Sequence, residues 1–212
     1  MPNHATSSTG IARLGTIALA GIAAFVAACI ASQFLHPDLN WLRAPMSFYL
    51  LGDHGGWLRA GYVALALALA ALGVGYYRAL HPQARSSGSR ALFVIGATGL
   101  CVTAIADSDR SGLSVEGLIH GIAALTAFLC VSIAMLLQSW CMRGDALWRA
   151  RFTTAFALAL ACFVALWVHA LWREAPRGLS QKLVMALIVL WLGLAATWLR
   201  RAGAVGAGTQ PE

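Results

Sequence analysis

Charged side chains are scarce in this sequence. Of its 212 residues, 11% are charged and 59% are hydrophobic, and the mean hydropathy is +0.72. A soluble domain carries about 25% charged residues, so this chain has too few charges to cover a surface that faces water. The scarcity therefore excludes an ordinary soluble domain and favours residence in a membrane.

Acidic residues are the scarcest charged group, and their deficit leaves a formal net charge of +7. A basic chain can bind nucleic acid, but these arginines stand at the ends of apolar runs and do not follow one polar face. That placement is typical of topology signals and of contacts with lipid headgroups. We therefore expect membrane lipids as partners and no nucleic acid.

Motifs for metal ligation are also missing. The five cysteines lie inside apolar runs or at the end of one, without a CxxC or Cys/His spacing. No HxxxH or HExxH pattern occurs. The cysteines are interpreted as small apolar filler, and no disulfide is expected.

What the chain does have is six long apolar runs. A helix needs about 20 residues to cross the hydrocarbon core, so the runs predict an all-α, polytopic bundle of six transmembrane helices. The expected domain covers residues 14–202, between a polar cytoplasmic tail at 1–13 and a Gly- and Ala-rich tail at 203–212 that is expected to be disordered. A cleaved signal peptide, or a lipoprotein cleavage box at 26–29, is the alternative for the first run. The expected spans are 14–35, 57–80, 91–106, 113–140, 152–172 and 182–199.

The Lys/Arg distribution predicts the orientation. Nine basic residues fall on the side of the termini and six on the other side. This excess predicts that both termini lie in the cytoplasm. We expect the protein to be a multi-pass protein of the inner (plasma) membrane. In the first outer link, residues 47–51 are expected to form a short interfacial helix.

Polar side chains collect in the three outer links. The turn after the third span is the most acidic stretch, with Asp107, Asp109 and Glu116 within ten positions. His120 stands seven residues inside the next run, roughly 10 Å along the helix, and shares a face with Glu116. Burying an ionisable group at that depth costs a few kcal/mol unless it is paired or wetted, so we expect His120 to point into the bundle.

These links supply the candidate site. Ser47, Asp109 and His120 are the candidate catalytic residues. The candidate substrate-binding residues are Tyr49, Asp107, Glu116, His169, Arg173, Gln181 and Lys182.

Structural roles compete with each of these functional ones. His120 can simply hydrogen-bond a neighbouring helix, and His169 can anchor a helix end at the interface. Asp107 and Asp109 can be turn or N-cap residues of the fourth span, with Ser114 as another candidate cap.

The links also carry a family resemblance. The segments 36–39, 47–52, 56–58, 117–121 and 178–182, together with the acidic turn, are similar in order and spacing to the DUF998 family of six-span membrane proteins of unknown function. The resemblance covers residues 14–200 and implies the six-helix fold. Family members often have Phe-Pro-x-Asp in the acidic turn, where this chain has 106–109; Asp109 is the preferred match.

Two classes of function fit this placement. The first is an intramembrane hydrolase or transferase that acts on lipid with Ser, Asp and His. In a zinc-dependent version, His120, His169 and either Asp109 or His54 would be ligands. The second is a binding or transport protein for lipid or a small molecule, in which Arg173 or Lys182 meets an anionic headgroup. Haem ligation by His120 and His169 is disfavoured because the two histidines stand at different depths.

Overall fold

The computed structural model describes residues 4–109 and 114–208, and these residues form helices with no strand. Each of the six long helices is long and apolar enough to cross a membrane, which confirms the expected fold class. Even the shortest, with 19 residues, spans about 28 Å of a hydrocarbon core about 30 Å thick. The long helices are α1 (His4–Leu35), α2 (Gly55–Ala79), α3 (Ser87–Ile105), α4 (Val115–Arg143), α5 (Phe152–Leu171) and α6 (Arg177–Gly208). The short 3-10 helices are η1 (Met46–Leu50), η2 (Pro82–Ala84) and η3 (Arg149–Arg151).

The first and last helices are longer than the spans expected from hydropathy. α1 begins at His4 and α6 ends at Gly208, so both continue into the segments interpreted as tails. Residues 1–3 and 209–212 of those tails lie outside the described residues. Hydropathy misses these extensions because it measures how apolar a segment is. A helix can continue past the apolar segment, since its backbone hydrogen bonds do not depend on apolar side chains.

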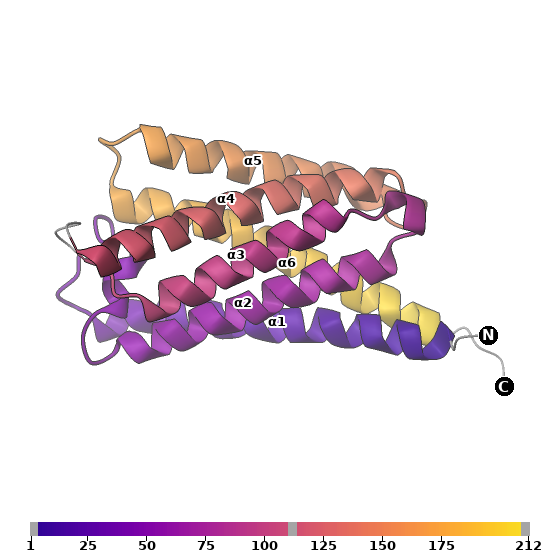
Figure 1. The fold of residues 1–212 in the computed structure, drawn as a ribbon, viewed down its shortest axis with the longest axis horizontal. Coiled ribbons are helices and arrows are strands. Elements are labelled where there is room, and N and C mark those ends of the chain that lie inside the picture. The colour runs from indigo at the N-terminus through magenta and orange to yellow at the C-terminus, as the bar shows by residue number, and fades with distance from the viewer. Residues whose placement is uncertain (1–3, 110–113, 209–212) are drawn as a thin grey trace.

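The helices pack as a ring in chain order, which α6 closes against α1. α1 begins and α6 ends at the same end of the bundle, here the termini end, in Figure 1. The links 36–54, 106–109 and 172–176 lie at the opposite end, here the link end. The shared end of the termini agrees with six crossings; the side of the membrane on which it lies remains a prediction.

Small residues let neighbouring helices approach closely. A Cβ added to Gly21 would lie 2.4 Å from the Ala64 carbonyl oxygen, so α1 and α2 touch through their backbones there. A Cβ on Gly99 would lie 2.9 Å from the Ala123 carbonyl oxygen between α3 and α4. Such contacts are the usual source of helix association in lipid, where no hydrophobic force draws helices together.

Local chemistry explains where the helices start and end. The hydroxyls of Ser86 and Ser114 accept hydrogen bonds from backbone N–H groups in the first turns of α3 and α4, as N-caps do. α1 ends two residues before Pro37, whose ring cannot continue a helix. The expected short helix of the first link is present as η1, and its depth in a membrane remains a prediction.

Candidate functional site

A cavity lies inside the link half of the bundle, among α1, α2, α3, α4, α6 and η1. Its volume is about 70 Å³, several times the roughly 10–15 Å³ that one water needs. The cavity therefore has room for a few waters or a short stretch of hydrocarbon chain and excludes a bulky ring system. Most of its wall is apolar. Side chains with polar atoms are contributed by Ser47, Tyr62, Thr103, His120 and Gln181.

These five residues come from five separate segments and all lie toward the link end. Ser47 is in η1, Tyr62 is in the second turn of α2, and Thr103 is near the end of α3. His120 and Gln181 are near the starts of α4 and α6. The deeper wall is made of aliphatic and aromatic side chains such as those of α4 and α6. The cavity is thus polar at one end and apolar over the rest of its length.

His120 is held by one ring nitrogen. Its side chain is buried, with 5% of its surface exposed, and its Nδ1 lies 3.0 Å from the carbonyl oxygen of Ala106. Because that oxygen can only accept, Nδ1 carries the proton and Nε2 is left with a lone pair in the neutral ring. Nε2 forms no hydrogen bond with another described residue. The expected partner was an acid or a serine, and the turn instead provides a backbone carbonyl.

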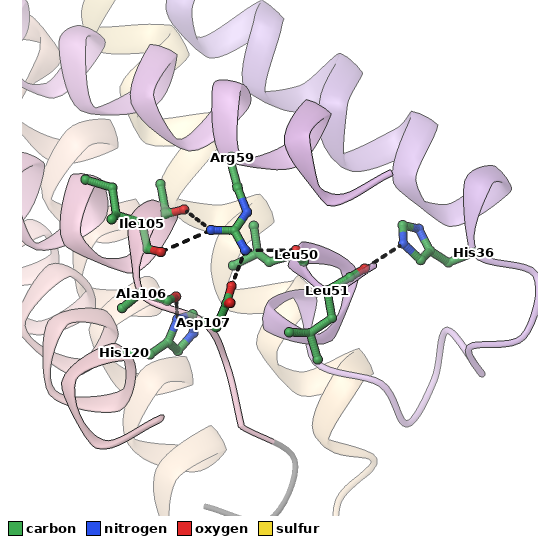
Figure 2. A network of polar contacts seen from close by, with 9 residues as sticks. His36, Leu50, Leu51, Arg59, Ile105, Ala106, Asp107 and His120 are labelled. Atoms are coloured by element: carbon green, nitrogen blue, oxygen red, sulfur yellow. Dashed lines mark hydrogen bonds and ion pairs between the residues drawn. The ribbon is translucent and has the colours of Figure 1, made fainter. Parts of the chain in front are cut away.

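Arg59 fixes the turn against which His120 packs, as Figure 2 shows. Its guanidinium donates to the carbonyl oxygens of Ala104 at 2.8 Å, Ile105 at 3.1 Å and Leu50 at 3.3 Å, and it pairs with Asp107. Two of these oxygens are at the C-terminus of α3, where helix carbonyls lack partners and the dipole favours a cation.

The acidic residues of the turn have separate positions. Asp107 is exposed and pairs with Arg59, and Glu116 is exposed one turn before the buried His120. Asp109 accepts a hydrogen bond at 2.9 Å from the backbone N–H of Ser114, directly before α4. None of the three contributes to the cavity wall. Residues 110–113, in the middle of the acidic turn, lie outside the described residues.

The start of α6 is fastened to the first link. Gln181 accepts a hydrogen bond at 2.7 Å from the backbone N–H of Met46 through Oε1, which leaves its amide NH₂ without a partner among the described residues. Lys182 donates through Nζ to the carbonyl oxygens of Trp41 at 2.6 Å and Ala44 at 3.2 Å. Its Nζ also lies 5.2 Å from the centre of the Tyr49 ring.

Tyr49 lies beneath this contact and has no exposed surface. Burial, together with the charge of Asp38, raises the pKa of its hydroxyl above the usual value, because both disfavour the phenolate. Tyr49 also packs edge-on against His36, with ring centres 5.5 Å apart. It is therefore a packing residue of the link and does not line the cavity.

The fifth and sixth helices hold two candidates away from the cavity. His169 is half-buried, with Nδ1 2.7 Å from the Ser180 hydroxyl, and both residues line an open groove between α5 and α6. Arg173 is exposed in the turn after α5. The structure thus brings together Ser47, His120 and Gln181, and it holds the other candidates elsewhere.

The histidines and acids do not gather as a ligand set for zinc. Among residues 4–109 and 114–208, no group of three His, Cys, Asp or Glu side chains could hold a metal ion. His54 lies near His36, with ring centres 6.0 Å apart, whereas His120 lines the cavity and His169 lines the α5–α6 groove. The proposed zinc ligands therefore do not fit the metal.

Sequence reasoning missed three residues at the link end: Arg59, Tyr62 and Thr103. The signal for Arg59 was present, because it is the only charged residue in the apolar run 57–77. Tyr62 and Thr103 stand in apolar spans, where such residues often only pack, so their position in the bundle is what distinguishes them.

The family can now be stated. The model of a family described as proteins of unknown function (DUF998) matches residues 19–198. The chain belongs to the DUF998 family. No curated protein and no solved structure gave a match. The match confirms the resemblance found in the links, and it supports a six-helix membrane protein whose activity has to be argued from its own residues.

Proposed function

We propose that this DUF998 protein binds a membrane lipid, with the first methylenes of one acyl chain in the central cavity and the ester group of that chain at the polar end. The observation that carries the proposal is the polarity of the cavity, which changes from hydrogen-bonding groups to apolar wall along its length. A lipid chain attached through an ester has the same change of polarity.

The free groups at the polar end suit an ester. The hydroxyls of Ser47 and Tyr62 have no hydrogen-bond partner among the described residues, and the amide NH₂ of Gln181 is also available. These groups donate, and an ester carbonyl accepts. In a low-dielectric cavity an unpaired polar group is costly, so a ligand that satisfies several donors at once binds favourably.

The orientation in the membrane belongs to the same proposal. We place the termini in the cytoplasm and the polar end of the cavity near the outer surface of the inner membrane, because basic residues are more numerous at the termini end. A lipid of the outer leaflet would then have its ester group at the depth of Ser47 and His120.

Native mass spectrometry of the purified protein tests lipid binding. Ala124 lines the cavity from α4 and is half-buried, so Ala124→Trp fills it. We expect a lipid adduct on the native chain and its loss in Ala124→Trp. The control is Leu125→Trp, at a neighbouring position that is 58% exposed. Equal adducts on all three proteins would contradict the proposal.

A second function, hydrolysis or transfer of the same acyl group, is favoured by one observation. The Nδ1 bond of His120 leaves Nε2 as a base in the cavity that Ser47 also lines. The Ser47 oxygen would attack the ester carbonyl carbon while its proton passes to Nε2. The proton would then go to the departing alcohol oxygen as the ester bond breaks, and water would release the acyl group from Ser47.

Ser47→Ala and His120→Ala separate the two functions. If the protein is an acyl hydrolase, both variants keep the lipid adduct and lose ester cleavage, measured as release of fatty acid from a lysophospholipid. If the protein only binds, the native chain releases no fatty acid and the variants weaken the adduct. Release at the native rate by Ser47→Ala would exclude Ser47 as the nucleophile.

A further inference from the structure

A second hollow lies beside the cavity, between α1 and α6. This α1–α6 groove has a volume of about 470 Å³ and opens on the outside of the bundle. Cys29 and Ala186 line it along its length, and Gln33, Trp41 and Lys182 line it toward the link end.

The groove exists because the two helices diverge. At the termini end they touch, since a Cβ on Gly15 would lie 2.6 Å from the backbone nitrogen of Arg200. Toward the link end α6 leaves α1 and passes beneath α5, as Figure 1 shows. The groove occupies the space between the two helices. In a membrane, the groove would face the lipid of the bilayer.

The groove and the central cavity share part of their walls. Phe25, Met185 and Val189 line both hollows, so these side chains stand between them. None of the three is polar, and Met185 is an unbranched side chain that changes shape readily. A hydrocarbon chain in the groove would therefore reach the cavity by passing between these three side chains.

The mouth of the groove carries one cation. The Lys182 Nζ donates to two backbone carbonyl oxygens, and no carboxylate of residues 4–109 or 114–208 forms an ion pair with it; the ion pair in these ranges is that of Arg59 and Asp107. Its charge is thus solvated by dipoles and not neutralised by an acid. A phosphate of a lipid headgroup would provide the missing counter-charge, through a charge-assisted hydrogen bond.

We infer that the α1–α6 groove is the lateral entrance to the cavity for an anionic phospholipid. The phosphate meets Lys182 at the mouth, and the chain passes between Phe25, Met185 and Val189 from the bilayer. This inference rests on the proposed lipid binding, and it adds the route of entry and the charge of the headgroup.

Two positions allow the route to be tested apart from the binding. Ala186 lines only the groove and Ala124 lines only the cavity, so Ala186→Trp obstructs the route and Ala124→Trp fills the site. Leu183→Trp is the control, because Leu183 lies on the side of α6 that faces the α5–α6 groove. The probe is a pyrene-labelled lysophosphatidylglycerol, followed by stopped-flow fluorescence with the purified full-length protein in lipid nanodiscs.

We expect Ala186→Trp to slow association and dissociation by the same factor, about tenfold, with an unchanged equilibrium affinity, while Leu183→Trp behaves as the native chain. Native rates in Ala186→Trp would overturn the lateral route and leave the proposed function standing. Native affinity in Ala124→Trp would overturn the proposed function itself.

The headgroup is tested with a monoacylglycerol probe that carries the same label and lacks the phosphate. We expect the native protein to bind the phosphoglycerol probe about tenfold more tightly, the scale of one hydrogen bond to a charged group. Lys182→Gln should abolish this preference and Lys182→Arg should retain it. Equal affinities of the native protein for both probes would overturn the assignment of an anionic lipid.

Discussion

The two halves of the bundle are built differently. In the termini half, large aromatic side chains fill the interior: Trp148 and Trp191 are 0% and 1% exposed, and Tyr76 stacks edge-on against Trp148 with ring centres 5.0 Å apart. The Tyr76 hydroxyl donates to the Ala195 carbonyl oxygen at 2.9 Å. In the link half, the interior contains the cavity, and polar side chains line it.

The difference shows how polar groups are used in each half. Asp145 at the termini end is 6% exposed and accepts hydrogen bonds from the backbone N–H groups of His81 and Leu147, so its carboxylate closes a loop. His120 at the link end uses one nitrogen for the fold and has its other nitrogen free of described partners. The termini half is therefore packed throughout, and the proposed ligand binding belongs to the link half.

The largest effect on stability is expected from Trp191 in the termini half. Trp191→Ala removes a buried ring whose Nε1 donates to the Ala155 carbonyl oxygen at 2.9 Å, and it should lower the free energy of unfolding by about 3–5 kcal/mol. Titration with a denaturing detergent measures this. Trp57→Ala, at a position 68% exposed, is the control and should stay near native stability. If both variants unfold alike, the aromatic packing does not distinguish the halves.

Arg59 should have the next largest effect, because it joins α2, η1 and the end of α3. Arg59→Met removes hydrogen bonds from a charged donor to three carbonyls and should cost about 1.5–3 kcal/mol. Asp107→Asn breaks only a partly exposed ion pair, which is worth about 1 kcal/mol or less. Thermal unfolding of both variants compares them; a larger loss in Asp107→Asn would mean that the ion pair, and not the carbonyl contacts, holds the turn.

Gln181 should have a smaller effect at the wall of the cavity. Gln181→Ala leaves the Met46 N–H without its acceptor, at a cost of about 1 kcal/mol. Gln181→Glu keeps an oxygen at the same position and should retain more stability, while it loses the amide donors offered to a ligand. Melting temperatures and lipid adducts measured side by side test this split. The same stability in both variants would show that the bond to Met46 contributes nothing.

The fold followed from hydropathy and the site only in part, for physical reasons. Six apolar runs determine six helices, because a backbone in lipid must satisfy its own hydrogen bonds. The position of His120 inside a run predicted burial correctly, since an ionisable group at that depth is costly on the lipid side. Its partner could not be predicted, because the Ala106 carbonyl is a backbone group that no residue type reveals.

Asp109 illustrates the other limit. An acid near a histidine in sequence suggested a shared site, but the turn directs the Asp109 carboxylate to the Ser114 N–H. Tyr62 joins the cavity from a helix whose other lining residues, Leu65 and Leu69, are apolar. Membership of the cavity depends on how helices distant in sequence rotate against one another, and a single sequence contains no direct measure of that rotation.

The smallest expected effect concerns pH at the link end. Tyr49 has a raised pKa because of burial and the charge of Asp38, whereas an unfolded tyrosine ionises near pH 10. The resulting stability is fully present below about pH 10 and is lost as pH rises through the raised pKa of the folded state. The native chain should therefore lose stability relative to Tyr49→Phe in alkaline solution. The free energy of unfolding of both proteins is measured from pH 8 to 11. The same pH dependence in the two proteins would contradict this.

Photocrosslinking tests the central claim most directly, namely that the link half takes a lipid chain into its interior. The probe is a lysophosphatidylglycerol with a diazirine in its chain, and peptide mass spectrometry locates the adducts. We predict adducts at residues that line the cavity and not the groove, Leu65 and Phe128, that disappear in Ala124→Trp. Adducts confined to lipid-facing residues such as Ile122 and Leu125, each 58% exposed, would contradict the claim.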